Sequence, residues 1–337
     1  MAVVEVMQTN VPAPKDAPLR ERGSVFTDEI SMDFADACRT AAAAGLRYVD
    51  IRRVWGVFSH EVPRERWPEM ARILADAGLR IGAVQSNFGK CPLSGPGYDE
   101  HLRFFPTLVE QAQYFGVDVM RVFPFWNEVR MSDDPPPPGG IRPNLEPALA
   151  EIVRRLQPAV ALAEREGIWL GLEPEHSTYS GSPQEVARIV GAVNSPHLGV
   201  AWDVNNGWDD LSIDEAYALF RGRVVNVHVK ERALSPSERR LLAAAGGQPR
   251  RQPALLGTGA IPWPQVIRAL EQDGYRGVYS IETHFGARGR YGWEKLKAAT
   301  TYYIYALREL LEDAEAALNV ASAASTAQPG SGSPPRP

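Results

Sequence analysis

Two hydrophobic patterns alternate along the chain. Short apolar runs such as Tyr48-Val49-Asp50-Ile51 are typical of strands that are buried on both faces, whereas longer runs with a 3.6-residue period predict helices. Gly78 and Gly116 each follow a predicted helix directly, as expected of a helix C-cap, and the next strand begins within three residues. Strands that alternate with helices through such short turns run parallel, so the sequence predicts an α/β fold.

Eight strand–helix units can be counted. The strands are expected at 3–7, 48–51, 80–85, 119–123, 169–173, 198–203, 224–229 and 278–282. The helices are expected at 34–44, 64–77, 100–115, 145–165, 183–193, 213–220, 264–272 and 293–318. Eight units favour a closed (β/α)₈ barrel, the TIM barrel, over an open doubly wound sheet, which stays the alternative. In the first unit a long entry loop separates the strand from its helix.

Three stretches fall outside this rhythm. Residues 131–144 follow the fourth strand and include four consecutive prolines, so we expect an extended loop over the catalytic face. Residues 231–257 follow the seventh strand and are expected to form a second extended loop there. Its arginines are Arg232, Arg239, Arg240, Arg250 and Arg251. We expect one barrel domain over 1–318 and a disordered tail over 319–337, which is rich in Ala, Ser, Gly and Pro.

Charge and composition narrow the possible partners and the compartment. The net charge of −5 argues against nucleic acid or an anionic membrane as the main partner. No apolar run reaches the roughly 18–20 residues that a membrane span needs, and no secretory signal is apparent. The two cysteines, Cys38 and Cys91, form no CxxC pair, which fits a reducing compartment. We therefore expect a cytoplasmic protein.

Four consecutive strands each end in a potential metal ligand: Glu173, Asp203, His228 and Glu282. Taken singly, each has an ordinary interpretation as a loop residue, a cap or a packed histidine. Their joint occurrence at the strand ends, where barrels place active sites, favours a shared site. Three converging carboxylates would repel one another without a cation. This oxygen-rich set suits one divalent ion, with Mn²⁺ expected first and Mg²⁺ or Co²⁺ possible.

Lys230 and His284 each lie two residues beyond a ligand. The period-two alternation of a strand places them on the same side as that ligand, where they are candidates for substrate contact. An ordinary polar rim is the alternative interpretation. Trp55, Phe123, Phe125 and Trp126 are expected near the same mouth. Aromatic faces often stack on sugar rings, so Trp126 is a further substrate candidate, and a glycoside is a plausible substrate.

The chain is similar to the xylose isomerase-like superfamily of sugar and sugar-phosphate isomerases and epimerases. The similarity spans residues 3–311. It rests on Gly171-Leu172-Glu173, Trp202-Asp203-Val204-Asn205-Asn206, Val225-Asn226-Val227-His228-Val229-Lys230, Leu256-Gly257-Thr258-Gly259, Ile261-Pro262-Trp263, Gly274-Tyr275-Arg276-Gly277 and Ser280-Ile281-Glu282. The resemblance implies that the four residues above are the metal ligands. It also implies that Glu173 and Glu282 are the catalytic proton-transfer pair, one on each face of a substrate carbon.

The implied chemistry allows several outcomes. A metal that binds a carbonyl and the adjacent hydroxyl acidifies the neighbouring C–H, and a carboxylate can then remove the proton to give an enediolate. Reprotonation at the same carbon is epimerisation, and reprotonation at the neighbouring carbon is isomerisation. The leading hypothesis is therefore a metal-dependent isomerase or epimerase of a keto or aldo sugar. The alternative is a lyase, either a dehydratase of inosose or dehydroshikimate type or a C-glycoside-cleaving subunit.

One departure from the family pattern follows Asp203, at the end of the strand expected at 198–203. Many members carry a histidine three residues after the aspartate, and that histidine contacts substrate; here the position is Asn206, which cannot act as an acid or base. His176 could supply an imidazole instead. A non-catalytic sugar-binding barrel and an endonuclease are further alternatives, which the intact ligand set and the acidic charge disfavour. A sugar or glycoside substrate and a homo-oligomer or hetero-subunit are the expected partners.

Overall fold

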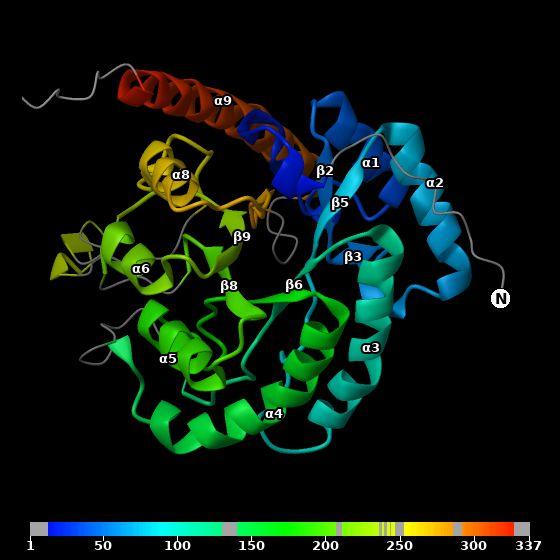
Figure 1. The fold of residues 1–337 in the computed structure, drawn as a ribbon, viewed down its shortest axis with the longest axis vertical. Coiled ribbons are helices and arrows are strands. Elements are labelled where there is room, and N and C mark those ends of the chain that lie inside the picture. Colours follow the sequence, from blue (N-terminus) through cyan, green and yellow to red (C-terminus); the bar gives the residue numbers. More distant parts are fainter. Residues whose placement is uncertain are drawn as a thin grey trace, which may run out of the picture.

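Eight parallel strands form the centre of the molecule (Figure 1). The computed structural model describes residues 13–129, 140–206, 211–235, 238, 241–242, 244–246, 253–285 and 292–326. The strands are β1 (Gly23–Val25), β2 (Tyr48–Ile51), β5 (Arg80–Val84), β6 (Val119–Val122), β7 (Trp169–Leu172), β8 (Leu198–Asp203), β9 (Val224–Val229) and β10 (Tyr279–Ile281). Their order is β1-β10-β9-β8-β7-β6-β5-β2, and a parallel bridge between Phe26 and Asp50 joins the outermost two. The sheet therefore closes into the predicted TIM barrel.

Helices surround the strands on the outside (Figure 1). They are α1 (Phe34–Ala43), α2 (Trp67–Ala77), α3 (Gly97–Phe115), α4 (Leu145–Glu166), α5 (Pro183–Val193), α6 (Ile213–Phe220), α8 (Trp263–Gln272) and α9 (Trp293–Thr326). Local sequence explains their ends. The Ser182 hydroxyl accepts the Glu185 N–H and so caps α5, and Gly78 ends α2 in the left-handed conformation. The predicted helices are therefore confirmed to within a few residues at most ends.

Smaller elements lie between these units. They are the hairpin of β3 (Arg53–Val54) and β4 (Val57–Phe58) and the 3₁₀ turns η1 (Pro14–Asp16), η2 (Leu19–Glu21), η3 (Thr27–Glu29), η4 (Ser59–Glu61) and η5 (Arg64–Arg66). Among the residues that the structure describes, no helix combines the length and apolar character needed to cross a membrane.

The first strand of the barrel differs from the prediction. It is β1, inside the expected entry loop, and it pairs in parallel with β10 from Gly23 opposite Tyr279 to Val25 opposite Ile281. The expected strand at 3–7 lies outside the described residues. A strand of three residues between two 3₁₀ turns shows no periodicity of its own. Its pairing with a strand more than 250 residues away, not its local pattern, makes it part of the sheet.

The end of the chain is also more helical than predicted. Helix α9 continues to Thr326, so residues 319–326 belong to a helix and not to the expected tail. Three alanines at 321, 323 and 324 favour this extension, because alanine has the highest helix propensity. Residues 327–337 lie outside the described part. So do most of the loop expected at 131–144 and the arginines Arg239, Arg240, Arg250 and Arg251.

Candidate metal centre

The four predicted ligands converge at the carboxyl ends of four adjacent strands. Glu173 follows β7, Asp203 ends β8, His228 lies near the end of β9, and Glu282 follows β10. One ligand atom from each lies within 4.8 Å of all the others. The residues are 3%, 0%, 0% and 3% exposed. Strand pairing sets this arrangement, because Asp203 lies opposite His228 in the β8–β9 register.

The His228 ring shows that this set fits a metal ion. Its Nε2 is 3.1 Å from Gln85 Oε1, whereas its Nδ1 is buried and has no hydrogen-bond partner among the described residues. That Nδ1 lies 3.5 Å from Glu173 Oε1 and 3.8 Å from Glu282 Oε2. An orphaned buried nitrogen that faces two carboxylates has the geometry of a ligand set. The four residues could therefore hold one divalent ion.

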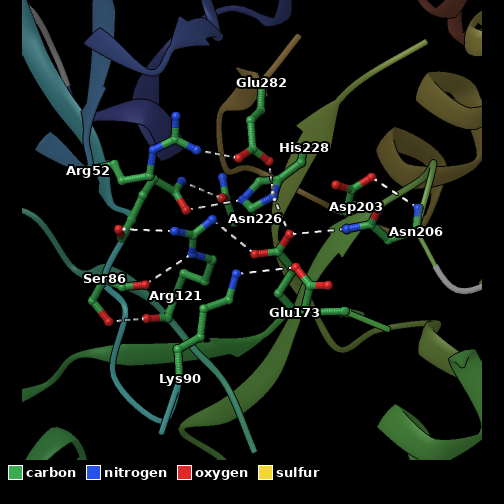
Figure 2. A network of polar contacts seen from close by, with 12 residues as sticks. Arg52, Ser86, Lys90, Arg121, Glu173, Asp203, Asn206, Asn226, His228 and Glu282 are labelled. Atoms are coloured by element: carbon green, nitrogen blue, oxygen red, sulfur yellow. Dashed lines mark hydrogen bonds and ion pairs between the residues drawn. The ribbon is translucent and has the colours of Figure 1, made fainter. Parts of the chain in front are cut away.

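Each ligand carboxylate also contacts a basic side chain, and Figure 2 shows these contacts for Glu173 and Glu282. Arg121 Nη1 donates to Glu173 Oε2 at 3.0 Å, and Arg52 Nη1 donates to Glu282 Oε1 at 2.5 Å. Lys230 Nζ lies 2.5 Å from Asp203 Oδ2 and 3.0 Å from Glu282 Oε2. Buried carboxylates that lie this close together require neighbouring positive charges to offset their repulsion. The two arginines bind the oxygens of Glu173 and Glu282 that do not face His228.

The cations keep both glutamates ionised. Burial alone would raise the pKa of Glu173, but the Arg121 guanidinium holds it below its ordinary value. Burial would likewise raise the pKa of Glu282, but Lys230, His284 and Arg52 hold it well below its ordinary value. Both side chains can therefore bind a cation or accept a proton at neutral pH.

The structure brings three of the five predicted substrate contacts to the ligands. Asn206 Nδ2 donates to Glu173 Oε1 at 3.4 Å, and Lys230 contacts two ligands as described. His284 Nε2 lies 3.1 Å from Glu282 Oε1, and its side chain is 47% exposed, so it is accessible from solvent. His284 has a φ of 58°, a left-handed conformation that is costly for a histidine.

The other two candidates lie further along the loops. His176 is half-buried beside Glu175; its charge helps Lys90 to lower the pKa of Glu175 to about 2 against the effect of burial. Trp126 is 48% exposed and forms isolated bridges to Pro92 and Thr178. Neither has a described contact with the four ligands, so their role in substrate binding stays a prediction.

The expected aromatic mouth is smaller than predicted. Phe123 and Phe125 are both fully buried. Lys90 and Arg121 cover the ring of Phe123, and Phe125 packs against Tyr98 of α3. Phe125 has a φ of 71°, in the left-handed region, and is buried, whereas the neighbouring Trp126 is 48% exposed, so consecutive aromatic residues have different surroundings.

Sequence reasoning missed Arg52, Arg121 and Gln85. Arg121 lies inside β6, where its Nε and Nη2 donate to the carbonyls of Ser86 and Gln85 at 3.1 and 3.2 Å. An arginine within an otherwise apolar strand is a usable signal, because arginine is rarely buried without a carboxylate partner. Asp50 inside β2 carried the same signal.

The arginine-bearing loop after β9 begins in the protein interior. Arg232 is 2% exposed, and the Glu231 carboxylate accepts N–H groups from Arg232, Gly257 and Ile261 at 3.0, 3.3 and 3.1 Å. The carboxylate therefore holds the two ends of the loop together. Arg232 itself is not part of an exposed basic surface.

A cavity of about 750 Å³ opens at the opposite, amino-terminal end of the barrel. Gly82, Asn226 and Trp169 are among its lining residues, which include none of the four ligands. Barrel active sites lie at the carboxyl ends of the strands, so this cavity is separate from the metal centre.

The family model of the Xylose isomerase-like TIM barrel matches residues 38–311. The chain belongs to this family. The resemblance stated from the sequence is thereby confirmed. No curated protein matched the chain.

Solved structures repeat the fold of this Xylose isomerase-like TIM barrel. A family protein from Mycobacterium smegmatis in complex with magnesium has a TM-score of 0.62 at 19% identity, covering 89% of this chain and 91% of that one. The 3-keto-D-glucoside 4-epimerase of E. coli has a TM-score of 0.60 at 13%, covering 84% and 98%. A probable 3-DHS dehydratase from Bacillus anthracis has 0.59 at 16%, covering 82% and 97%. At these identities the likeness shows the fold alone.

Proposed function

We propose that the protein is a metal-dependent isomerase or epimerase that acts on a keto or aldo sugar, or on a glycoside of one. The observation that supports this proposal is that two ionised carboxylates, those of Glu173 and Glu282, lie beside the position where one metal ion would bind. Glu173 and Glu282 approach the Nδ1 side of His228 from different strands, at 3.5 and 3.8 Å. Two carboxylates that flank one substrate carbon can exchange its proton between faces.

The ion that we propose is Mn²⁺, with Mg²⁺ and Co²⁺ as alternatives, because three of the four donors are carboxylates. A bound divalent ion would polarise the substrate carbonyl and so acidify the adjacent C–H. Glu173, Asp203, His228 and Glu282 would hold it. The magnesium complex of the Mycobacterium smegmatis protein is consistent with a divalent ion on this scaffold.

The chain's own residues would move the proton. Glu173 removes a proton from the carbon next to the carbonyl, and Glu282 delivers one from the opposite face, or the reverse. Arg121 binds Glu173 Oε2, and Arg52 binds Glu282 Oε1. These contacts orient each carboxylate so that Glu173 Oε1 and Glu282 Oε2 face His228 Nδ1. Lys230 and Asn206 lie close enough to the ligands to bind substrate oxygens.

Proton exchange with solvent tests this proposal. The Mn²⁺-supplied protein is incubated with a panel of keto and aldo sugars and 3-keto-glycosides in D₂O, and deuterium incorporation is followed by NMR. We expect exchange at one carbon of at least one substrate, lost in Glu173→Gln. Glu309→Gln, a change on α9 away from the centre, is the control and should leave exchange intact. Absence of exchange across the panel would rule out the reaction.

Elimination is the second candidate, because a histidine and an ammonium lie beside Glu282. Lys230 Nζ is 3.0 Å from Glu282 Oε2, and His284 Nε2 is 3.1 Å from its Oε1. His284 could protonate a leaving hydroxyl or aglycone after Glu173 has removed the proton on the neighbouring carbon. A dehydratase is among the structures that share the fold. An unsaturated ketone or a released aglycone, seen by ultraviolet absorbance, would identify this reaction; interconverted sugars alone would exclude it.

A further inference from the structure

We infer that Asp50 and Gln85 are positioning residues that select the nitrogen of His228 that binds the metal. The inference rests on the proposed metal centre and extends it to the buried polar side chains inside the barrel that support His228. A polar layer fills the barrel at this level, and Ser24, Asp50, Asn226 and Ser280 are each at most 1% exposed. Gln85 connects this layer to His228.

Backbone groups fix the direction of the hydrogen bonds in this layer. The Ala83 N–H can only donate, and it donates to Asp50 Oδ1 at 3.1 Å. The Val278 carbonyl can only accept, and it accepts from Asn226 Nδ2 at 3.3 Å. Asn226 therefore turns its Oδ1 towards Gln85, and Asp50 turns its Oδ2 there. Two acceptors thus face the Gln85 side chain.

Those acceptors settle the orientation of the Gln85 amide. Its Nε2 donates to Asp50 Oδ2 at 2.7 Å and to Asn226 Oδ1 at 2.9 Å. Its Oε1 must then face His228 Nε2, at 3.1 Å, and an oxygen can only accept. When the imidazole carries a single proton, that proton is therefore held on Nε2. The Nδ1 lone pair remains available on the side of Glu173 and Glu282.

The hydrogen bond from His228 Nε2 to Gln85 opposes the electrostatic effect of the neighbouring carboxylates. The carboxylates of Glu173 and Glu282 lie 3.5 and 3.8 Å from Nδ1 and would attract a proton to that nitrogen. A proton on Nδ1 would block metal binding there. The Asp50–Gln85 chain opposes that attraction by holding an acceptor at Nε2.

A glycine makes room for the chain. A Cβ at Gly82 would lie 3.0 Å from Asp50 Oδ1 and 2.9 Å from Val278 Cγ1. Such a contact would displace the carboxylate that orients Gln85. Gly82 therefore allows strand β5 to pass beside the Asp50 carboxylate.

The test compares variants of the full chain by two measurements. The first is the ¹⁵N–¹H NMR signal of the Nε2 proton in ¹⁵N-histidine-labelled, metal-free protein, assigned by its loss in His228→Gln. The second is the dissociation constant of Mg²⁺, a diamagnetic probe, by calorimetry. In Gln85→Leu and Asp50→Asn we expect the Nε2 proton signal to be lost and the dissociation constant to rise about 10–100-fold.

Two further variants separate positioning from stability. In Asp50→Asn with Gln85→Glu, the new carboxylate accepts from both the substituted amide and His228, so the Nε2 proton and most of the Mg²⁺ affinity should return. Gln111 is also fully buried and donates to the Ser59 carbonyl at 2.9 Å. Gln111→Leu is the matched control, and we expect a lower Tm with both His228 measurements unchanged.

Retention of the Nε2 proton in Gln85→Leu and Asp50→Asn would overturn the inference, whether or not Mg²⁺ affinity falls. If the wild-type protein bound neither Mg²⁺ nor Mn²⁺, the proposed metal centre would fail instead. The proton measurement would still decide the role of Asp50 and Gln85, because it needs no metal. If one of the two single variants does not fold, the other gives the same decision.

Discussion

Glu282 is the most heavily engaged ligand of the candidate centre. Its Oε1 contacts Arg52 and His284, and its Oε2 contacts Lys230. Arg52 also donates to Asp28 Oδ2 and Glu29 Oε1 at 2.8 and 3.0 Å, so one guanidinium joins three carboxylates. A side chain held from several directions has little rotational freedom left, which suits a ligand that also transfers protons.

Replacing Glu282 tests both roles at once. In Glu282→Gln, one negative charge is removed from the ligand set while the shape is kept. We expect Mn²⁺ affinity to fall more than about 100-fold, since loss of even an outer partner costs about 10–100-fold. Proton exchange into substrate should fall about 10²–10⁴-fold. The measurements are calorimetric titration and NMR.

Glu271→Gln is the matched control for this change. Glu271 pairs with the nearly buried Arg22 and accepts from the Tyr279 hydroxyl at 2.9 Å, away from the ligands. We expect its replacement to lower the free energy of unfolding while Mn²⁺ affinity stays within about twofold of wild type. Equal loss of Mn²⁺ affinity in both variants would contradict the ligand role of Glu282.

His101 offers a pH test that is independent of the site. It is 8% exposed, its Nδ1 accepts the Gly89 N–H at 3.0 Å, and burial lowers its pKa from 6.5 to about 4. Between those pH values the unfolded chain binds a proton that the folded protein does not. The free energy of unfolding therefore falls as pH falls through this window, by up to roughly 3 kcal/mol.

The variant His101→Asn keeps an acceptor for the Gly89 N–H and removes the titrating ring. We expect this variant to have a lower free energy of unfolding than wild type at pH 7.5. The difference in the free energy of unfolding between the two proteins should narrow by about 1–3 kcal/mol by pH 4. Urea denaturation at each pH measures this difference, in which other titrating groups largely cancel. Parallel pH profiles for the two proteins would show that His101 is not held neutral.

The sequence was sufficient to predict those site residues that lie at the ends of strands. Glu173, Asp203, His228 and Glu282 could be found because each ends an apolar run, and parallel strands end at one face. Arg121 carried a signal, because it lies within an apolar strand, but the partners of Arg52 and Arg121 could not be predicted, because the partner of a buried cation depends on which strands are neighbours. That order is set by long-range pairing and is not visible in local periodicity.

Among the elements, the loops after β6 and β7 are tied together by one buried ion pair. Arg142 binds Glu185 of α5 through two nitrogens, at 2.9 and 2.6 Å, and both side chains are at most 2% exposed. Arg142 also donates to the carbonyls of Val129 and Thr178. The pair therefore holds the segments that follow Trp126 and His176.

Breaking this pair on one side leaves a buried charge without its partner. We expect Arg142→Met or Glu185→Leu to lower the free energy of unfolding by about 3–5 kcal/mol each. The double variant should cost less than the sum, because neither charge then remains buried. Chemical denaturation of the four proteins measures the coupling. Additive losses would show that the two side chains act independently.

Pattern reasoning failed at strand β1, which has three residues. Periods of two or 3.6 residues need a longer window to be recognised. Its partner β10 is equally short but was predicted, because it lies in the run at 278–282 between two predicted helices. The long helices and the longer strands were found because each presents a full apolar face.

At the scale of the whole molecule, closure of the barrel brings its first and last strands together at the site. The bridge from Phe26 to Asp50 and the hydrogen bond from Phe26 N to the Ile281 carbonyl, at 3.1 Å, join β1 to β2 and β10. Arg52 and Glu282, 230 residues apart, can meet only because of this closure. The site is therefore complete only in the fully folded barrel, and metal binding should be coupled to global stability.

Lys230 makes this coupling measurable. Its ammonium contacts Asp203 Oδ2 and Glu282 Oε2, so it and a divalent ion would neutralise the same buried carboxylates. In Lys230→Met the folded protein would depend more on the ion for charge compensation. We expect the rise in Tm on adding Mn²⁺, measured against the protein in chelator, to be several degrees larger in Lys230→Met than in wild type. Lys295→Met on α9 should behave as wild type, and an equal rise in all three proteins would show that Lys230 does not compensate the ligand charges.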